Sequence, residues 1–155
     1  IPTIERGIRE SAQTGVLAAA AVIGIKVTLL DGSYHEVDST ELAYKIAATQ
    51  AFQDAVEKAG PVLLEPVMDV EIVVPEDYAG NIMNDLNTRL ANISGINPRG
   101  NVQVIDATVP LAEMFGYATK VRNLSQGRGL FTMEFSSYQA VPSDVSKKMG
   151  IGITN

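Results

Sequence analysis

One stretch decides the fold of the second half of this chain: VPLAEMFGYATKVRNLSQGRGLFTMEF, residues 109–135. Pro110 suits the first turn of a helix, because its missing N–H would find no helical partner there. Apolar residues then recur at spacings of three or four, as on one face of a helix, at Leu111, Met114, Ala118 and Val121. Lys120 and Arg122 lie near the end of this predicted helix, where positive charge suits the helix dipole.

A glycine-rich turn ends this helix, and a strand follows it. Gln126-Gly127-Arg128-Gly129 interrupts the helical pattern, since glycine tolerates backbone angles that other residues avoid. Apolar side chains then alternate with polar ones, which predicts a half-buried strand, at Phe131, Met133 and Phe135. The stretch therefore predicts a helix, a basic turn and a strand that returns beneath the helix.

Composition limits the classes of protein to which the chain can belong. It has 155 residues, 46% of them hydrophobic, enough for one ordinary domain or two small ones with a buried core. A net charge of −6 argues against bulk attraction to nucleic acid but leaves room for a local basic patch. The sequence has no cysteine, which excludes disulfides and thiolate metal sites. No stretch approaches about 18 uninterrupted apolar residues, so no membrane span is expected.

Residues 1–60 predict two helices with one strand between them. Helical periodicity covers Thr3–Thr14, and β-branched residues favour a strand over Val22–Leu30. Asp38, with Glu41 three residues later, resembles a capping box and predicts the start of a long helix over Ser39–Ala59.

A domain boundary is expected at Gly60-Pro61, which ends the long helix. A lone strand exposes an unpaired backbone, so residues 1–60 are expected to be part of a larger α/β domain. The chain opens with Ile1 rather than Met, and we expect it to be a fragment of a longer protein.

Residues 61–142 predict an α+β domain. The expected elements are strand, helix, strand, strand, helix and strand, which is the ferredoxin-like split β-α-β order. Such a domain has an antiparallel sheet with both helices on one face. Besides the stretch quoted above, the pattern places a strand around Met68–Val74, a helix from Pro75, a short strand at Ile93–Ile96 and a strand at Val102–Val109. Residues 143–155 are left as a C-terminal tail.

Catalytic and metal-binding patterns are missing from this sequence. His35 is the only histidine and lies in a polar loop, residues 31–38, with no serine or cysteine nucleophile motif to accompany it. Composition alone favours an ordinary surface histidine over a partner-contacting one. The sequence has no H-E-x-x-H motif, no Asp-rich calcium loop and no phosphate-binding G-x-x-x-x-G-K-[ST]. We therefore expect no metal and no GTP or ATP hydrolysis in these residues.

Basic residues gather in one region of this acidic chain. Between residues 89 and 129 they outnumber the acidic Asp106 and Glu113, and most lie near helix ends or turns, where they can converge on phosphates: Arg89, Arg99, Lys120, Arg122 and Arg128. Scattered, solvated charge is the alternative. Stacking of the RNA-recognition-motif type is disfavoured, because Leu130 and Thr132 stand where its aromatic residues belong.

Long segments of the sequence resemble bacterial elongation factor G. The last domain of that family is similar to the stretch quoted above, to PVLLEPVMDVEIVVPEDYAGNIMNDLN and to INPRGNVQVIDATVPL. The second part of its fourth domain, which has a ribosomal protein S5 domain 2-like fold, resembles IPTIERGIRE and DGSYHEVDSTELAYKIAATQAF. The resemblance runs essentially without gaps from Ile1 to about Tyr138.

The resemblance implies the C-terminal part of a cytoplasmic translational GTPase that promotes movement of tRNA and mRNA on the ribosome. GTP and Mg²⁺ are expected in an N-terminal domain missing here, which leaves this fragment without catalytic residues or a cofactor. A monomer without membrane contact is expected. The family's fourth domain also has a left-handed crossover, against the usual handedness.

The resemblance also assigns RNA contacts. Ser33-Tyr34-His35-Glu36 matches the family's tip loop, which implies that the 31–38 loop meets decoding-site RNA. Eukaryotic relatives modify a histidine in this loop to diphthamide, which makes His35 the first choice for an RNA contact. The C-terminal domain is expected to touch ribosomal RNA of the GTPase-associated region through the five basic residues named above.

Two departures from the family pattern leave other functions open. Arg89-Leu90-Ala91 replaces a common Arg-Arg-Gly, which removes one positive charge and a helix-ending glycine, and Ala19-Ala20-Ala21 replaces a Gly-Tyr-Pro-like segment. The alternatives are a ribosome recycling factor or a tetracycline-type ribosomal protection factor of the same architecture. A stand-alone ferredoxin-like RNA-binding module is a third.

Overall fold

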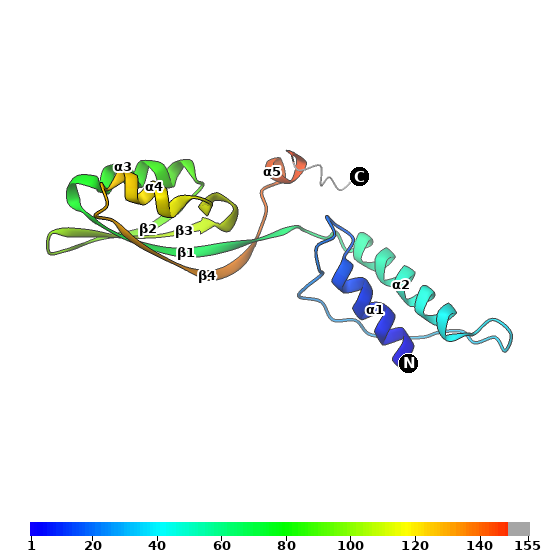
Figure 1. Cartoon of the computed structure of the whole chain (residues 1–155). Helices are drawn as coiled ribbons and strands as arrows, with labels where there is room; N and C mark the ends of the chain where they lie inside the picture. The colour runs from blue at the N-terminus through cyan, green and yellow to red at the C-terminus, as the bar shows by residue number, and fades with distance from the viewer. Residues whose placement is uncertain (149–155) are drawn as a thin grey trace. The chain divides into compact units, whose positions relative to one another are not determined.

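A computed structural model of the chain describes residues 1–148, which divide into two compact units. The first unit comprises Ile1–Leu63 with the described residues that follow Val141, and the second comprises Leu64–Val141. The division falls close to the Gly60-Pro61 boundary expected from the sequence. It lies in the short connection between helix α2 (Glu41–Lys58) and strand β1 (Leu64–Pro75) (Figure 1).

The first unit is built on two helices that pack together, α1 (Pro2–Thr14) and α2. A β-carbon at Gly7 would lie 3.0 Å from the backbone oxygen of Lys45, so only glycine permits this approach without a shift. The Lys45 ammonium also reaches across to the Glu10 carboxylate of α1, at 2.6 Å. The two helices bury Gly7 and Ser11 of α1 and Ala48, Phe52 and Val56 of α2.

The strand predicted over Val22–Leu30 is wrong, because this segment forms no strand in the structure. A strand needs a hydrogen-bonding neighbour, and none of residues 1–148 supplies one here. Its alternate side chains line a groove with α1 instead and stay about half exposed: Ile25, Val27 and Leu29.

The capping box expected at Asp38 and Glu41 is also wrong. Helix α2 begins at Glu41, and Thr40 caps it, because its side-chain oxygen accepts a hydrogen bond from the Ala43 N–H at 3.1 Å. Asp38 lies one turn earlier, within the loop that precedes the helix.

The second unit has the ferredoxin-like order that the sequence predicted. A four-stranded antiparallel sheet has the strand order β2-β3-β1-β4, with α3 and α4 on one side of it (Figure 1). After β1 the elements are α3 (Glu76–Thr88), β2 (Asn92–Arg99), β3 (Val102–Pro110), the 3-10 helix η1 (Leu111–Met114), α4 (Tyr117–Leu124) and β4 (Leu130–Ala140). Helix α5 (Ser143–Lys148) follows in the tail, and residues 149–155 lie outside the described part.

The two faces of the sheet differ in chemistry. Val70 pairs with Ala107 and Ile72 with Ile105, and these side chains form the core beneath the helices. The residues between them on β1 face the other way, where Glu71 pairs with Asp106. The helix-free face is therefore acidic, and it carries Asp69, Glu71, Asp106 and Glu134.

The prediction of one continuous helix from Pro110 is wrong, because the helix is interrupted. η1 ends at Met114, Gly116 adopts a left-handed conformation with φ 71°, and α4 begins at Tyr117. The break lets Met114 and Tyr117 both enter the core while Phe115 between them is exposed. Tyr117 therefore takes the buried position expected for Ala118, which is exposed.

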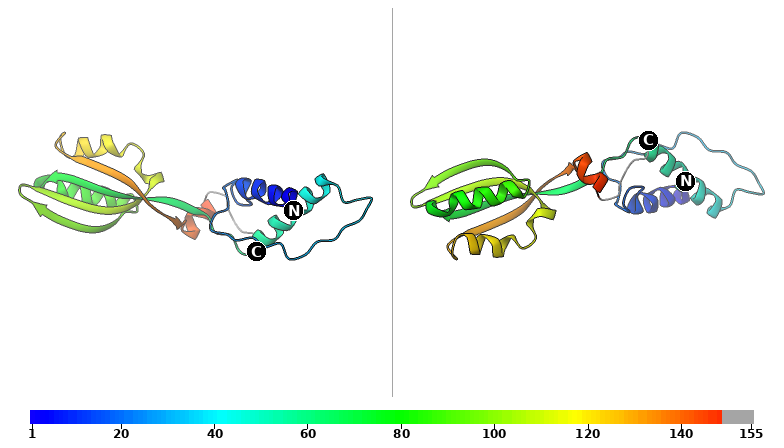
Figure 2. Two further views of the ribbon diagram at one scale, coloured as in Figure 1. Left: turned by 90° about the horizontal axis from the view of Figure 1, so that it is seen from below. Right: turned by 90° about the horizontal axis from the view of Figure 1, so that it is seen from above.

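Strand β4 is confirmed, but its predicted burial holds only at its start. Phe131 packs against the core, whereas Met133 and Phe135 are 38% and 55% exposed. An eight-residue helix spans about 12 Å, and an eleven-residue strand spans about 36 Å. Helix α4 is thus too short to cover the strand, as the two further views show (Figure 2).

No helix among residues 1–148 combines the length and the hydropathy that crossing a membrane requires.

Candidate RNA-contacting surfaces

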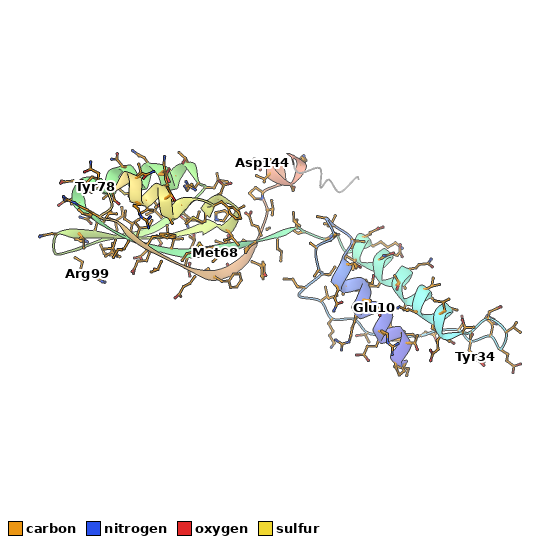
Figure 3. The ribbon with its side chains drawn as sticks, in the orientation of Figure 1. Glu10, Tyr34, Met68, Tyr78, Arg99 and Asp144 are labelled. Atoms are coloured by element: carbon orange, nitrogen blue, oxygen red, sulfur yellow. The ribbon has the colours of Figure 1, made fainter. Side chains whose placement is uncertain are left out.

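The 31–38 loop presents polar side chains and is attached to the start of α2. The backbone N–H of His35 donates to the Ser39 hydroxyl oxygen at 2.7 Å, and the Ser39 N–H donates back to the His35 carbonyl at 3.0 Å. The Tyr44 hydroxyl donates to the Ser33 carbonyl at 3.3 Å. These bonds hold the backbone of the loop while its side chains stay exposed; Tyr34 lies at the far end of the loop (Figure 3).

The turn after α4 is folded back onto that helix by a buried serine. The Ser125 hydroxyl donates to the Val121 carbonyl at 2.6 Å and accepts from the Gly129 N–H at 2.8 Å. The Gly127 N–H donates to the Arg122 carbonyl at 2.8 Å, and Gly127 has φ 79°. This network fixes the backbone that carries Arg122 and the turn residue Arg128.

The sheet register brings a third basic residue to the same end of the domain. Pro75 at the end of β1 pairs with Val102, which also pairs with Arg99. Two residues earlier on β1, Val73 pairs with Leu130, the residue that follows the turn after α4. We call this surface the basic end and define it as Arg99, Arg122 and Arg128, which are exposed and form no ion pair within residues 1–148. The exposed Glu76 and Asp77 follow Pro75 at the same end, so the three arginines leave it with a net positive charge of one. Figure 3 shows Arg99 at the hairpin between β2 and β3.

Arg89 differs from the other predicted contacts because its side chain is used inside the domain. Its Nε lies 2.8 Å from the Asp85 carboxylate, and another guanidinium nitrogen donates to the Glu113 carbonyl. Its guanidinium carbon lies 4.8 Å from the centre of the Tyr117 ring, a cation–π geometry. The side chains of Arg89 and Asp85 are only 18% and 13% exposed. Lys120 joins this cluster at 3.8 Å from Asp85 and stays 47% exposed.

Tyr117 occupies the centre of this cluster. Its ring is fully buried and meets Phe131 edge to face, with ring centres 5.4 Å apart. Burial raises the pKa of its hydroxyl, the Asp85 carboxylate raises that pKa further, and the Arg89 guanidinium lowers it. The ring is therefore part of the core, and the hydroxyl forms no hydrogen bond with the described residues.

The structure thus separates the predicted residues into three places: the 31–38 loop with Ser33, Tyr34, His35 and Glu36; the basic end; and the interior cluster of Arg89 with Lys120 at its edge. Sequence reasoning missed Ser125 and Asp85, which position the basic residues without being basic. The spacing Ser125-x-x-x-Gly129 at a predicted helix end was a signal for the first. Within residues 1–148, no group of three or more potential ligands is placed to hold a metal ion.

Comparisons with known proteins match both units. The family model for elongation factor G domain IV matches residues 1–60, and the model for the elongation factor G C-terminus matches residues 62–149. Elongation factor G of Fervidobacterium nodosum is 60% identical over 149 residues, and that of Aquifex pyrophilus is 52% identical, each over 96% of this chain. A crystal structure of a protein from Thermus thermophilus is similar with a TM-score of 0.85 and 41% identity over 96% of this chain and 22% of that one.

In chain order, the two models are those of domain IV and of the C-terminus of one protein family. The chain belongs to the elongation factor G family. It spans 22% and 21% of the length of the two relatives named above.

Proposed function

We propose that this chain is the ribosome-binding C-terminal part of an elongation factor G-type GTPase that promotes translocation of tRNA and mRNA. The match of both units to that family, at 60% identity to one relative, carries the proposal. GTP and Mg²⁺ would bind in the N-terminal part of the whole factor, and the residues described here would supply contacts rather than chemistry. The factor would act as a monomer in the cytoplasm, away from membranes.

The 31–38 loop is proposed to meet decoding-site RNA beside the tRNA and mRNA. Its hydroxyl, imidazole and phenol groups can donate hydrogen bonds to exposed base edges, and the carboxylates of Asp31, Glu36 and Asp38 can accept them from base amino groups. Base edges rather than phosphates are therefore the expected contacts of this loop. The backbone of the loop is also held by hydrogen bonds to two side chains, that of Ser39 just before α2 and that of Tyr44 within it. Less conformational entropy is then lost on binding than with a loose loop of the same composition. A pinned loop can therefore act as a block against backward movement of tRNA.

The basic end is proposed to meet ribosomal RNA of the GTPase-associated region. Arg99, Arg122 and Arg128 are exposed there, and arginine forks match phosphate geometry. The helix-free face of the sheet is a poor alternative, because Asp69, Glu71, Asp106 and Glu134 would repel phosphates. The two surfaces would together fix the orientation of the factor on the ribosome.

Replacement of His35 tests the role of the loop. The full-length factor with His35→Ala is expected to translocate several-fold more slowly while its ribosome-stimulated GTP hydrolysis stays close to normal. Asp54→Ala, which removes an exposed ion pair on α2 with Lys58, is the matched control and should change neither rate. Normal translocation by the His35 variant would remove this residue from the mechanism.

A ribosome recycling or tetracycline-type protection factor is the second candidate. The replacement of a family glycine by Ala91 and of a Gly-Tyr-Pro-like segment by Ala19-Ala20-Ala21 favours a specialised member of the family. Three assays with the same full-length factor separate these functions: translocation, splitting of ribosomes into subunits, and release of bound tetracycline. Activity in either of the last two without translocation would replace the first proposal.

A further inference from the structure

We infer that Arg89 is a positioning residue that holds helix α4 in place, and that it is not one of the phosphate contacts. The inference deepens the proposed function, because α4 and the turn after it carry Lys120, Arg122 and Arg128. It also changes the role that the sequence suggested for Arg89, which came from its charge and its place at the end of a helix.

The helical backbone is broken between η1 and α4. Phe115 has an extended backbone with ψ 129°, and Gly116 is left-handed, so no continuous helical ladder fixes the direction of α4 relative to η1. Arg89 contacts both sides of this break. It donates to the Glu113 carbonyl in η1 and lies over the ring of Tyr117, the first residue of α4. A side chain from the end of α3 thus contacts both η1 and α4, between which the helical hydrogen bonds are interrupted.

The guanidinium of Arg89 is largely engaged within the domain. It is shared among the Asp85 carboxylate, the Glu113 carbonyl and the Tyr117 ring, and 18% of the Arg89 side chain is exposed. With so little of the side chain exposed, a phosphate that engaged the guanidinium through both its edges would displace the contacts to Asp85 and Glu113. The Asp85 carboxylate, which is itself only 13% exposed, would then lose its closest cation. Arg128 has no such commitments within the described residues and lies in an exposed turn.

The contacts of Arg89 require the geometry of a guanidinium. A planar guanidinium can donate in two directions at once and stack on an aromatic face, whereas an ammonium is a compact point charge. Lysine at position 89 would keep the charge and lose the simultaneous contacts to Asp85, Glu113 and Tyr117. A positioning role therefore predicts that Arg89→Lys behaves like Arg89→Gln, and a role in attracting phosphates predicts that lysine largely restores binding.

Salt dependence of ribosome binding separates the two roles. We would measure the Kd of the full-length factor for 70S ribosomes, with a non-hydrolysable GTP analogue, over a series of KCl concentrations. Loss of one phosphate contact lowers the slope of log K against log salt by about 0.7–0.9. Arg128→Gln is expected to lower the slope by this amount. Arg89→Gln and Arg89→Lys are expected to weaken binding several-fold and to the same extent, with slopes equal to each other.

Hydrogen exchange of the same variants measures how well the amides of α4 are protected, and therefore whether the helix stays packed. Amides of Tyr117–Leu124 are expected to exchange at least several-fold faster in Arg89→Lys than in the wild type. Ile93→Val, which trims a partly buried side chain on β2, controls for general destabilisation and should leave both the Kd and the exchange of α4 unchanged. If Arg89→Gln does not fold, Arg89→Lys carries the test.

Two results would overturn the inference. One is a slope reduced in Arg89→Gln as much as in Arg128→Gln, with wild-type affinity in Arg89→Lys. The other is unchanged exchange of α4 in Arg89→Lys. Failure of the wild-type factor to bind ribosomes would instead defeat the proposed function, and the exchange measurement would still decide the role of Arg89.

Discussion

The side-chain oxygen of Ser125 accepts a hydrogen bond from the backbone N–H of Gly129 at 2.8 Å, and this bond closes the turn that carries Arg128. The contact leaves no room for a side chain at position 129. A β-carbon there would lie 2.6 Å from the Ser125 oxygen and 2.9 Å from a methyl carbon of Val121. The position of a basic residue thus depends on one buried hydroxyl and one glycine.

Gly129→Ala is expected to destabilise the domain by about 1–3 kcal/mol, because the added methyl overpacks a site with no free volume. Ser125→Ala is expected to cost about 1–3 kcal/mol, since it leaves the part-buried Gly129 N–H without a partner. Thermal unfolding of the chain measures both. Ser136→Ala on exposed strand β4 is the control and should change little. Equal melting temperatures for all four proteins would contradict this account of the turn.

Leu90 follows α3 with a left-handed backbone, φ 58°, which costs an ordinary side chain about 1–2 kcal/mol. Leu90→Gly is therefore expected to stabilise the domain by up to about 1 kcal/mol, after the entropy cost of a glycine is subtracted. Leu130→Gly is the matched control, because that leucine is similarly exposed but lies in a strand, where glycine is unfavourable. The two variants should shift the melting temperature in opposite directions. A lower melting temperature for Leu90→Gly would show that the leucine makes a contact worth more than its strain.

The buried hydroxyl of Tyr117 makes stability sensitive to high pH. Its pKa is raised in the folded state, so above the ordinary tyrosine value of about 10 the unfolded chain releases this proton first. Stability is therefore full below pH of about 10 and falls above it, by at most about 1.4 kcal/mol per pH unit from this group.

Tyr117→Phe tests that dependence. The variant is expected to match the wild type near pH 7 or to exceed it slightly, because the hydroxyl is buried without a partner among the described residues. Above pH of about 10 it should lose less stability than the wild type, measured as the midpoint of urea unfolding across the pH range. Parallel pH profiles for the two proteins would rule Tyr117 out as the source of alkaline sensitivity.

Thr40 caps helix α2, and Asp38 does not. Thr40→Ala is expected to cost about 1 kcal/mol, whereas Asp38→Ala should change stability by no more than a few tenths of that amount. Circular dichroism of both variants during thermal unfolding provides the comparison. The reverse order of effects would restore the capping box that the sequence suggested.

Regular patterns in the sequence predicted the fold correctly where the strands and helices that pack against a segment belong to the same chain. The alternation around Met68–Val74 correctly predicted β1, because both neighbouring strands and the covering helices are present. The equally β-branched Val22–Leu30 forms no strand, because β-propensity is realised only against a partner strand. The spacing of apolar residues did not reveal the break at Phe115-Gly116, because Met114 and Tyr117 keep a helix-like spacing across it.

The candidate site was predictable in part. Charge and position alone identified the exposed Arg99, Arg122 and Arg128, and equally the interior Arg89, because a one-dimensional pattern does not show which carboxylate a guanidinium reaches. The pairing of Arg89 with Asp85 has the i, i+4 spacing of a helix ion pair, but its contact with Glu113 depends on how η1 packs. Long-range placement of this kind comes only from the folded structure.

Tethered hydroxyl-radical probing of the full-length factor on the ribosome tests most directly whether the two surfaces meet two different regions of ribosomal RNA. The cleaving group would be attached in turn to Tyr34→Cys in the 31–38 loop and to Arg128→Cys in the basic end. We predict cleavage of decoding-site RNA from the first and of the GTPase-associated RNA from the second. Cleavage of neither region, or of one and the same region from both positions, would contradict the account.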